Sequence, residues 1–162
     1  MRKPGIYLAA LLMFSLIAQS AAQNSTTKQP SEDYSGMYAF LREGEFLQVN
    51  IEDQSRVTGF VSRFGDSESD RGAFLDQFFK QGKLDGNKLS FTTQTVHGVW
   101  YEFNGTIERG EGKNPPDEAY YVLKGTLREN RSDADKKVSS TSSQVAFKSF
   151  PKDMESVPPK RD

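Results

Sequence analysis

The sequence contains no cysteine, a single histidine and a single tryptophan among its 162 residues. Without a thiol the chain cannot form a disulfide scaffold, a thiolate zinc site or a cysteine nucleophile. One histidine leaves little for triad or metal chemistry. Its 21 basic and 22 acidic residues nearly cancel, which argues against binding nucleic acid through bulk charge. These absences argue against an enzyme and predict no metal and no cofactor.

Glycine and aromatic residues are concentrated in the middle of the chain. Twelve of the 13 glycines and 15 of the 19 aromatic residues lie between Tyr34 and Glu129, but only two of the seven prolines do. This distribution predicts one globular domain of roughly a hundred residues with less ordered flanks.

Residues 1–22 have the pattern of a secretory signal peptide. Arg2 and Lys3 give a positive start, an apolar run begins at Ile6, and small residues lead to a cleavage point near Ala22. The apolar run is shorter than the roughly 20 residues that a membrane-spanning helix needs. We therefore expect a secreted or periplasmic protein without a stable membrane anchor.

The middle of the chain is typical of half-buried strands, because its apolar residues recur at every second position between Gly, Asn and Asp turns. Eight strands are predicted, at residues 37–42, 45–52, 56–64, 79–84, 88–95, 99–109, 119–129 and 144–150. The short connections suit hairpins, and pairing the last strand with the first removes unpaired edges. The predicted fold class is therefore all-β: an eight-stranded antiparallel up-and-down (meander) β-barrel.

The composition of the two segments that flank the strands predicts that both are disordered. Residues 23–33 contain no apolar side chain and predict a disordered leader, and residues 151–162 carry three prolines among charges and predict a disordered tail. The barrel domain then spans residues 34–150. Within it, the Ser-rich residues 132–143 predict a flexible loop before the closing strand.

Two local features refine the barrel. The spacing of Phe74, Leu75 and Phe78 is compatible with one or two helical turns, so a short helix is expected between strands three and four.

If the hairpin of the two longest strands centres near Asn114, Phe103 faces Gly125, and each strand's glycine makes room for a large neighbour.

A glycine directly before the first strand's Met37 and Tyr38, in an exported chain followed by a hairpin meander, resembles the calycins, the group of lipocalin-like and avidin-like barrels. The resemblance covers residues 35–150 in outline. It implies a barrel whose interior binds a small apolar or aromatic ligand, and it implies no specific ligand contacts. The sequence also resembles a set of exported bacterial proteins without assigned function.

The aromatic residues predicted to face the barrel interior are the candidate ligand-binding residues, and three of them, Tyr38, Tyr101 and Tyr121, are expected at one mouth of the barrel together with the single histidine. The candidates are Tyr38, Phe40, Phe91, Tyr101, Phe103, Tyr121 and His97. Ligand pockets are mainly apolar with a few polar groups. The same residues suit a closed hydrophobic core, which an eight-stranded barrel can fill with side chains alone, and this interpretation is favoured for most of them.

A second aromatic group, Phe46, Trp100 and Tyr120, is predicted on the outer face. Exposed aromatic patches usually mark interfaces, so these residues either mediate self-association or contact with a partner, or pack under the loop and tails.

The acidic residues Asp66, Glu68 and Asp70 alternate like the first ligands of a calcium loop. Gly72 comes one place late, however, and Gln77 stands where such a loop ends in glutamate. A solvated acidic loop is favoured.

The sequence thus favours an exported, non-enzymatic, small-ligand-binding β-barrel protein. The alternative is a structural or protein-interaction module with a filled barrel core.

Overall fold

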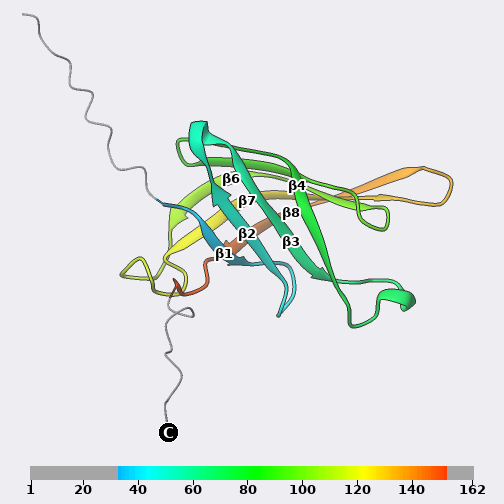
Figure 1. Cartoon of the computed structure of the whole chain (residues 1–162), viewed down its shortest axis with the longest axis horizontal. Helices are drawn as coiled ribbons and strands as arrows, with labels where there is room; N and C mark the ends of the chain where they lie inside the picture. The colour runs from blue at the N-terminus through cyan, green and yellow to red at the C-terminus, as the bar shows by residue number, and fades with distance from the viewer. Residues whose placement is uncertain (1–32, 153–162) are drawn as a thin grey trace, which may run out of the picture. The chain divides into compact units, whose positions relative to one another are not determined.

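The computed structural model describes residues 33–152 (Figure 1). They form one sheet of eight strands, in which each strand pairs antiparallel with the next, from β1 to β8. The strands are β1 (Gly36–Ala39), β2 (Phe46–Ile51), β3 (Val57–Phe64), β4 (Phe74–Asp85), β5 (Lys88–Thr93), β6 (Val99–Arg109), β7 (Tyr121–Ser132) and β8 (Val138–Lys148). The predicted signal peptide, nearly all of the leader and nearly all of the tail lie outside the described residues.

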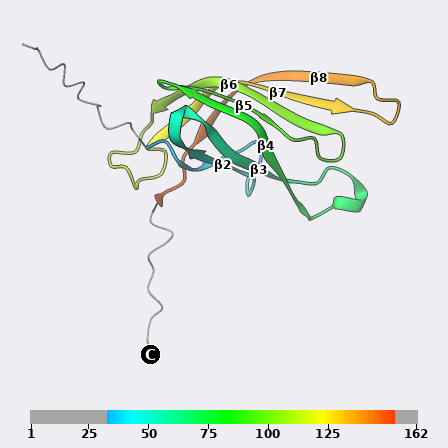
Figure 2. The ribbon, with the colours of Figure 1, turned by 45° about the horizontal axis from the view of Figure 1, so that its top comes forward.

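The predicted fold class is confirmed, since the eight strands meander up and down and the sheet curls into a half-barrel (Figures 1 and 2). The two ends of the sheet meet at one point, which we call the seam. There Tyr38 of β1 pairs with Ser149, just after β8, and the Phe150 amide donates a hydrogen bond of 2.8 Å to the Met37 carbonyl. In the part of the chain described, no helix is long and apolar enough to cross a membrane.

The concave face of the sheet carries the hydrophobic core. Six aromatic rings form a continuous row across it, with neighbouring ring centroids 4.4 to 6.2 Å apart. In order of contact they belong to Phe79, Phe91, Phe103, Phe147, Phe40 and Tyr101. Aliphatic side chains such as Leu47 and Leu123 are fully buried beside the row. The interior is therefore packed with side chains.

The register of β6 and β7 differs from the predicted one. Phe103 pairs with Leu127, two residues further along than predicted, and Gly105 faces Gly125 directly. A Cβ atom on Gly105 would lie 2.2 Å from the Lys124 carbonyl oxygen and 2.6 Å from the Phe103 ring. Each glycine therefore faces the other glycine and not a large residue. Because neither has a side chain, the two strands approach each other closely, and the Phe103 ring packs over Gly105.

The predicted helix between strands three and four is wrong. That loop contains a single 3-10 turn, Glu68–Asp70, and β4 already begins at Phe74. The reason is an inverted alternation: Gln77 is fully buried, whereas Phe74 and Phe78 are 51% and 54% exposed. A buried polar residue between exposed aromatics does not give the usual strand pattern.

The predicted flexible loop over residues 132–143 is also wrong for most of its length. β8 begins at Val138, and all 11 of its residues pair with β7, which itself extends to Ser132. Only the turn at residues 133–137 separates the two strands. The side chains of residues 138–144 are all exposed, so no apolar alternation marks this strand in the sequence.

We expect Gly105→Ala to lower the free energy of unfolding by roughly 1–3 kcal/mol, because the added methyl group overpacks a site already filled by Phe103 and the β7 backbone. Urea unfolding measures the change. Asn104→Ala is the matched control, since Asn104 is the adjacent, exposed residue and should change stability by no more than about 0.5 kcal/mol. Equal effects of the two substitutions would contradict the close glycine contact.

Candidate functional site

Six of the predicted ligand-binding residues are nearly inaccessible parts of one core cluster. Four of them, Phe40, Phe91, Tyr101 and Phe103, belong to the row of packed rings. The other two, Tyr38 and Tyr121, lie together at the seam.

The predicted grouping of Tyr38, Tyr101 and Tyr121 with His97 at one mouth is not formed. Tyr121 pairs with Arg109 and Tyr101 with Glu129, at opposite ends of the β6–β7 pair, which strand geometry separates by about 26 Å. His97 lies at the Tyr101 end, in the β5–β6 turn, where its Nδ1 is 2.7 Å from Asp70 Oδ2. The barrel therefore offers two separate ends, and these differ in chemistry.

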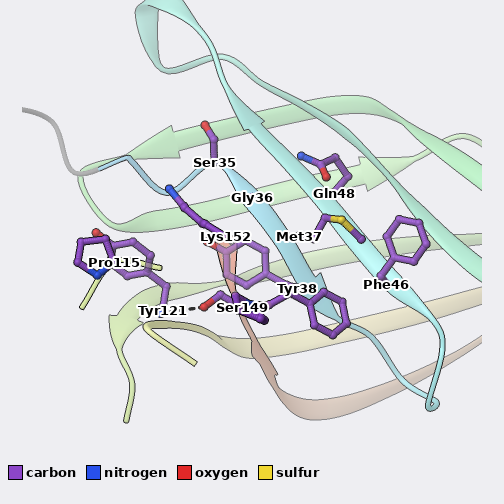
Figure 3. Close-up of a pocket in the computed structure, with 12 residues that line it drawn as sticks. Ser35, Gly36, Met37, Tyr38, Phe46, Gln48, Pro115, Tyr121, Ser149 and Lys152 are labelled. Atoms are coloured by element: carbon purple, nitrogen blue, oxygen red, sulfur yellow. Dashed lines mark hydrogen bonds between the residues drawn. The ribbon is translucent and has the colours of Figure 1, made fainter. Parts of the chain in front are cut away.

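The seam end holds a groove of about 780 Å³, which we call the seam groove (Figure 3). It is lined by β1 and the residues before it, by β2, by the β6–β7 loop and by the chain after β8. The lining residues are Ser35, Gly36, Met37, Tyr38, Phe46, Gln48, Pro115, Tyr121, Ser149, Phe150, Pro151 and Lys152. Only Tyr38 and Tyr121 had been predicted as ligand-binding residues. The others come from the residue before β1, from the outer face of β1 and β2, from the β6–β7 loop and from the chain after β8, where the alternation pattern carries no signal for a pocket.

The base of the seam groove is held by hydrogen bonds between β7 and the chain after β8. Ser149 N–H donates to the Tyr121 carbonyl at 2.9 Å, and the Ser149 hydroxyl accepts from the Tyr121 amide at 3.1 Å. The Tyr38 hydroxyl donates to the Tyr34 carbonyl at 2.7 Å. Burial, assisted by neighbouring Tyr121 and Asp33, raises the pKa of Tyr38 well above its usual range, so the residue stays a neutral phenol.

Lys152 is the one charged side chain among the residues that line the seam groove. It extends along the groove toward Ser35 (Figure 3), and its Nζ atom is 3.4 Å from Asp33 Oδ2, in a pair whose two side chains are largely exposed. Exposed pairs of this kind contribute little to stability, so the ammonium group can turn toward a bound molecule at small cost. The Gln48 amide donates to Asn50 at 2.9 Å on the opposite side of the groove.

The opposite end of the barrel carries a partly buried ionic network. Asp66, in the β3–β4 loop, contacts three arginines from three different elements. Its carboxylate oxygens lie 2.9 Å from Arg131, 3.1 Å from Arg63 and 3.4 Å from Arg42. The Arg63 side chain is buried and also donates to Gln77 at 2.8 Å.

The charges of this network are balanced within it. Arg42 also pairs with the buried Glu45, and Arg131 also pairs with Glu129. Burial raises the pKa of nearby Tyr101 to about 12 despite the opposing charge of Arg63. The network therefore ties the β3–β4 loop to β7 and to the β1–β2 turn, and its arginines already have partners.

The acidic residues of the β3–β4 loop have separate roles. Asp66 belongs to the arginine network, whereas Asp70 is bound by His97 and by the Ser67 hydroxyl, which donates at 2.6 Å. Across residues 33–152, no three His, Asp or Glu side chains converge as metal ligands would.

The predicted outer aromatics do not form one patch. Phe46 lines the seam groove and packs on Phe60, 5.8 Å away between centroids. Tyr120 is half-buried beneath the Arg109 guanidinium, 3.2 Å above its ring. Trp100 is half-buried on β6, opposite Asn130. Each of the three lies in a different environment.

A larger aromatic surface lies on the outer face of β2, β3 and β4, and we call it the aromatic stripe. Phe60 continues from Phe46 to Phe78 at 5.5 Å, and Phe64 packs on Phe74 at 4.5 Å. The stripe consists of Phe46, Phe60, Phe64, Phe74 and Phe78. The sequence does not predict its β4 members, because the spacing of Phe74, Leu75 and Phe78 indicates helical turns and not a strand.

The sequence matches no protein-family model, and no curated protein matches it. Solved structures do. Intact apo afifavidin is similar with a TM-score of 0.54 and 14% identity, over 78% of this chain and 88% of that one. The rhizavidin–biotin complex follows with a TM-score of 0.53 and 10% identity, over 74% and 94% of the two chains. Apo short afifavidin has a TM-score of 0.51 and 12% identity, over 72% and 95%.

These likenesses show the fold: the chain has the avidin-type architecture of eight antiparallel up-and-down strands. The predicted resemblance to avidin-type calycins is thereby confirmed. At such low identity the likeness shows the fold alone, because unrelated functions share one fold.

We expect the arginine network to stabilise the protein at neutral pH and to fail in acid. Partial burial raises the pKa of Asp66, but the hydrogen bond from Arg131 and the charges of Arg63 and Arg42 lower it further, to below its usual value. A carboxylate with a lowered pKa contributes stability above its unfolded-state pKa, and this contribution is lost as pH falls through the folded-state pKa. Part of the stability should therefore disappear below about pH 4.

Asp66→Asn should remove that acid-dependent part and lower the free energy of unfolding at pH 7 by about 1 kcal/mol. The figure is small because the Asp66 side chain is 36% exposed and the pairs are screened. Urea unfolding at pH 7 and pH 3 measures both effects. Glu68→Gln, the same charge change in the same loop but without an ion pair to residues 33–152, is the control. Identical pH profiles for the two variants would refute a special role of Asp66.

Proposed function

We propose that this protein binds a small, largely apolar or aromatic molecule in the seam groove. The volume of about 780 Å³ carries the proposal, since pockets for small molecules are typically about 300–1,000 Å³ and mainly apolar, with a few polar groups that orient the ligand. A solved structure of this fold in complex with biotin, that of rhizavidin, supports a ligand-binding barrel.

The lining of the groove suggests the chemistry of the ligand. Met37, Phe46 and Phe150 offer an apolar surface to the body of the molecule, while Lys152 offers a cation at the rim. A molecule with an apolar or aromatic body and one anionic or hydrogen-bond-accepting group fits this arrangement.

We also propose that binding occurs without chemical conversion of the ligand. The lining residues include no His, Asp, Glu or Cys, and the Ser149 hydroxyl already accepts the Tyr121 amide. A nucleophile needs a base within hydrogen-bonding reach, and His97 lies at the other end of the barrel. The pattern of residues 1–22 supports action outside the cytoplasm, after cleavage near Ala22.

Two probes test the groove: the anionic aromatic dye 1-anilinonaphthalene-8-sulfonate, followed by fluorescence, and biotin, followed by calorimetry. If either binds, Met37→Arg should weaken it at least tenfold, because the longer charged side chain enters the groove. Leu41→Arg is the control, since Leu41 is 45% exposed, Met37 is 39% exposed, and only Met37 lines the groove. Unchanged binding by Met37→Arg would contradict the site.

Tyr101→Phe distinguishes the groove from the barrel interior. Tyr101 lies in the packed row of rings at the far end, so loss of its hydroxyl should leave binding in the groove unchanged. A ligand that depends on Tyr101 and not on Met37 occupies the interior instead.

The aromatic stripe favours a second candidate function, which is binding of another protein through its apolar surface. Phe74 and Phe78 are more than half exposed although aromatic residues are usually covered, and patches of this kind mark interfaces. The packed core is consistent with such a module.

The double variant Phe74→Ser/Phe78→Ser tests this second candidate. A partner protein cross-linked to the parent should be lost from the double variant and retained by Met37→Arg, because the two changes lie in different surfaces. The double variant should lose roughly 1–3 kcal/mol of stability, because the ring contacts with Phe64 and Phe60 are lost, but it should remain folded, since both side chains are more than half exposed. A partner retained by the double variant would exclude the stripe as its binding surface.

A further inference from the structure

The outer edge of β8 lacks a neighbouring strand over almost its whole length. β8 pairs with β7 at all 11 positions, yet among residues 33–152 its other side forms backbone pairing with β1 only beyond its end, at Ser149 and Phe150. Together with β7, β8 forms a hairpin that extends away from the curled part of the sheet (Figures 1 and 2). This leaves a long row of backbone groups accessible to another strand.

The pairing pattern shows which backbone groups face the free edge. Ser149 N–H bonds to Tyr121 of β7, and Phe150 N–H points the other way, to Met37. Because these directions alternate along an antiparallel strand, the even-numbered residues of β8 direct their N–H and C=O groups outward. Ser140, Ser142 and Gln144 therefore present donors and acceptors to the edge.

This edge has none of the usual protection. Natural edge strands are blocked by charged residues, proline or bulges, but the segment from Val138 to Phe147 contains no charged residue and no proline, and its register with β7 is uninterrupted. Its first seven side chains are all exposed. Such a strand is suited to accept another strand by β-augmentation.

The order of residues in this segment indicates which strand it accepts. Read outward from Thr141, the sequence is symmetric over two positions in each direction: Ser140 and Ser142, then Ser139 and Ser143. An antiparallel pair formed with a second copy about a twofold axis at Thr141 places hydroxyl side chains opposite hydroxyl side chains at all these positions. Cross-strand Thr and Ser pairs of this kind are favourable.

Charges at the ends of this pairing are compatible with it. Lys148 of one copy would approach the β7–β8 turn of the other, whose two aspartates, Asp133 and Asp135, and two lysines, Lys136 and Lys137, give it no net charge. Within the symmetric segment, no charges face each other.

We propose that the free edge of β8 pairs with the same edge of a second copy of this chain, so that the two sheets join across a twofold axis at Thr141.

Single cysteines in the full chain test this geometry, because the chain has no cysteine of its own. Thr141 would face its own counterpart in a non-hydrogen-bonded pair with Cα atoms about 4.5 Å apart, which suits a disulfide. Thr141→Cys should therefore form a covalent dimer under mild oxidation. Ser140→Cys is the control, since its counterpart lies diagonally, about 7–8 Å away, and should cross-link at least tenfold more slowly.

Charge reversal tests the same axis without a cross-link. Thr141→Lys and Thr141→Glu should each abolish the concentration-dependent dimer seen by sedimentation, and mixing the two variants should restore it as a heterodimer. Both substitutions are at an exposed position, so the monomer should remain folded. Ser142→Pro should also abolish the dimer, because it removes an outward N–H, whereas Ser142→Ala should not.

Three results would overturn the proposal. The parent chain could remain monomeric at high concentration, Thr141→Cys and Ser140→Cys could cross-link at the same rate, or the mixed charge variants could fail to associate. An edge that instead accepts an extended segment of another protein would give the first of these results and would exclude a second copy as the partner.

Discussion

The structure depends on one constraint: a single sheet must bend far enough for its concave face to pack against itself. At one point of this sheet Gly105 and Gly125 face each other, and the Phe103 ring occupies the space that a side chain on Gly105 would need, while the β6 backbone occupies that of Gly125. From there the rings continue through Phe91 to Phe79 on one side and through Phe147 to Phe40 on the other. Aromatic contact across the interior thus replaces a second sheet or a covering helix as the source of the core.

This packing determines what each end of the barrel can do. An interior filled with rings leaves no need for polar groups inside it, so they are found at the two ends. At one end, Asp66 brings three arginines together and fastens a loop; at the other, Ser149 joins β7 to β1 and leaves the seam groove beside the junction. The same fold in rhizavidin accompanies bound biotin. In this chain the seam groove lies beside the sheet rather than within it.

Most of the fold could be predicted from alternation, because strands such as β2, β5 and β6 bury every second side chain. Prediction failed where a polar side chain is buried and a neighbouring apolar side chain is exposed. Gln77 is buried through bonds to Arg63 and to the Val99 carbonyl, while Phe78 beside it is exposed, which inverts the pattern of β4. The first half of β8 is held by backbone pairing and by polar side-chain bonds to β7, from Ser140 to Asn130 and from Gln144 to Thr126, so no apolar alternation marks it in the sequence. The seam groove could not be predicted because it combines the outer face of β2 with the chain after β8, two regions that the sequence does not relate.

The seam also has a kinetic consequence. Pairing Tyr38 with Ser149 joins the first strand to residues that follow the last one, so the contact closes nearly the whole domain into one loop. Contacts this distant in sequence form slowly, because the entropy of closing the loop is lost before the contact contributes. A ribosome would release every other strand before the residues that complete the barrel. Until those residues are in place, β1 has only β2 as a pairing partner.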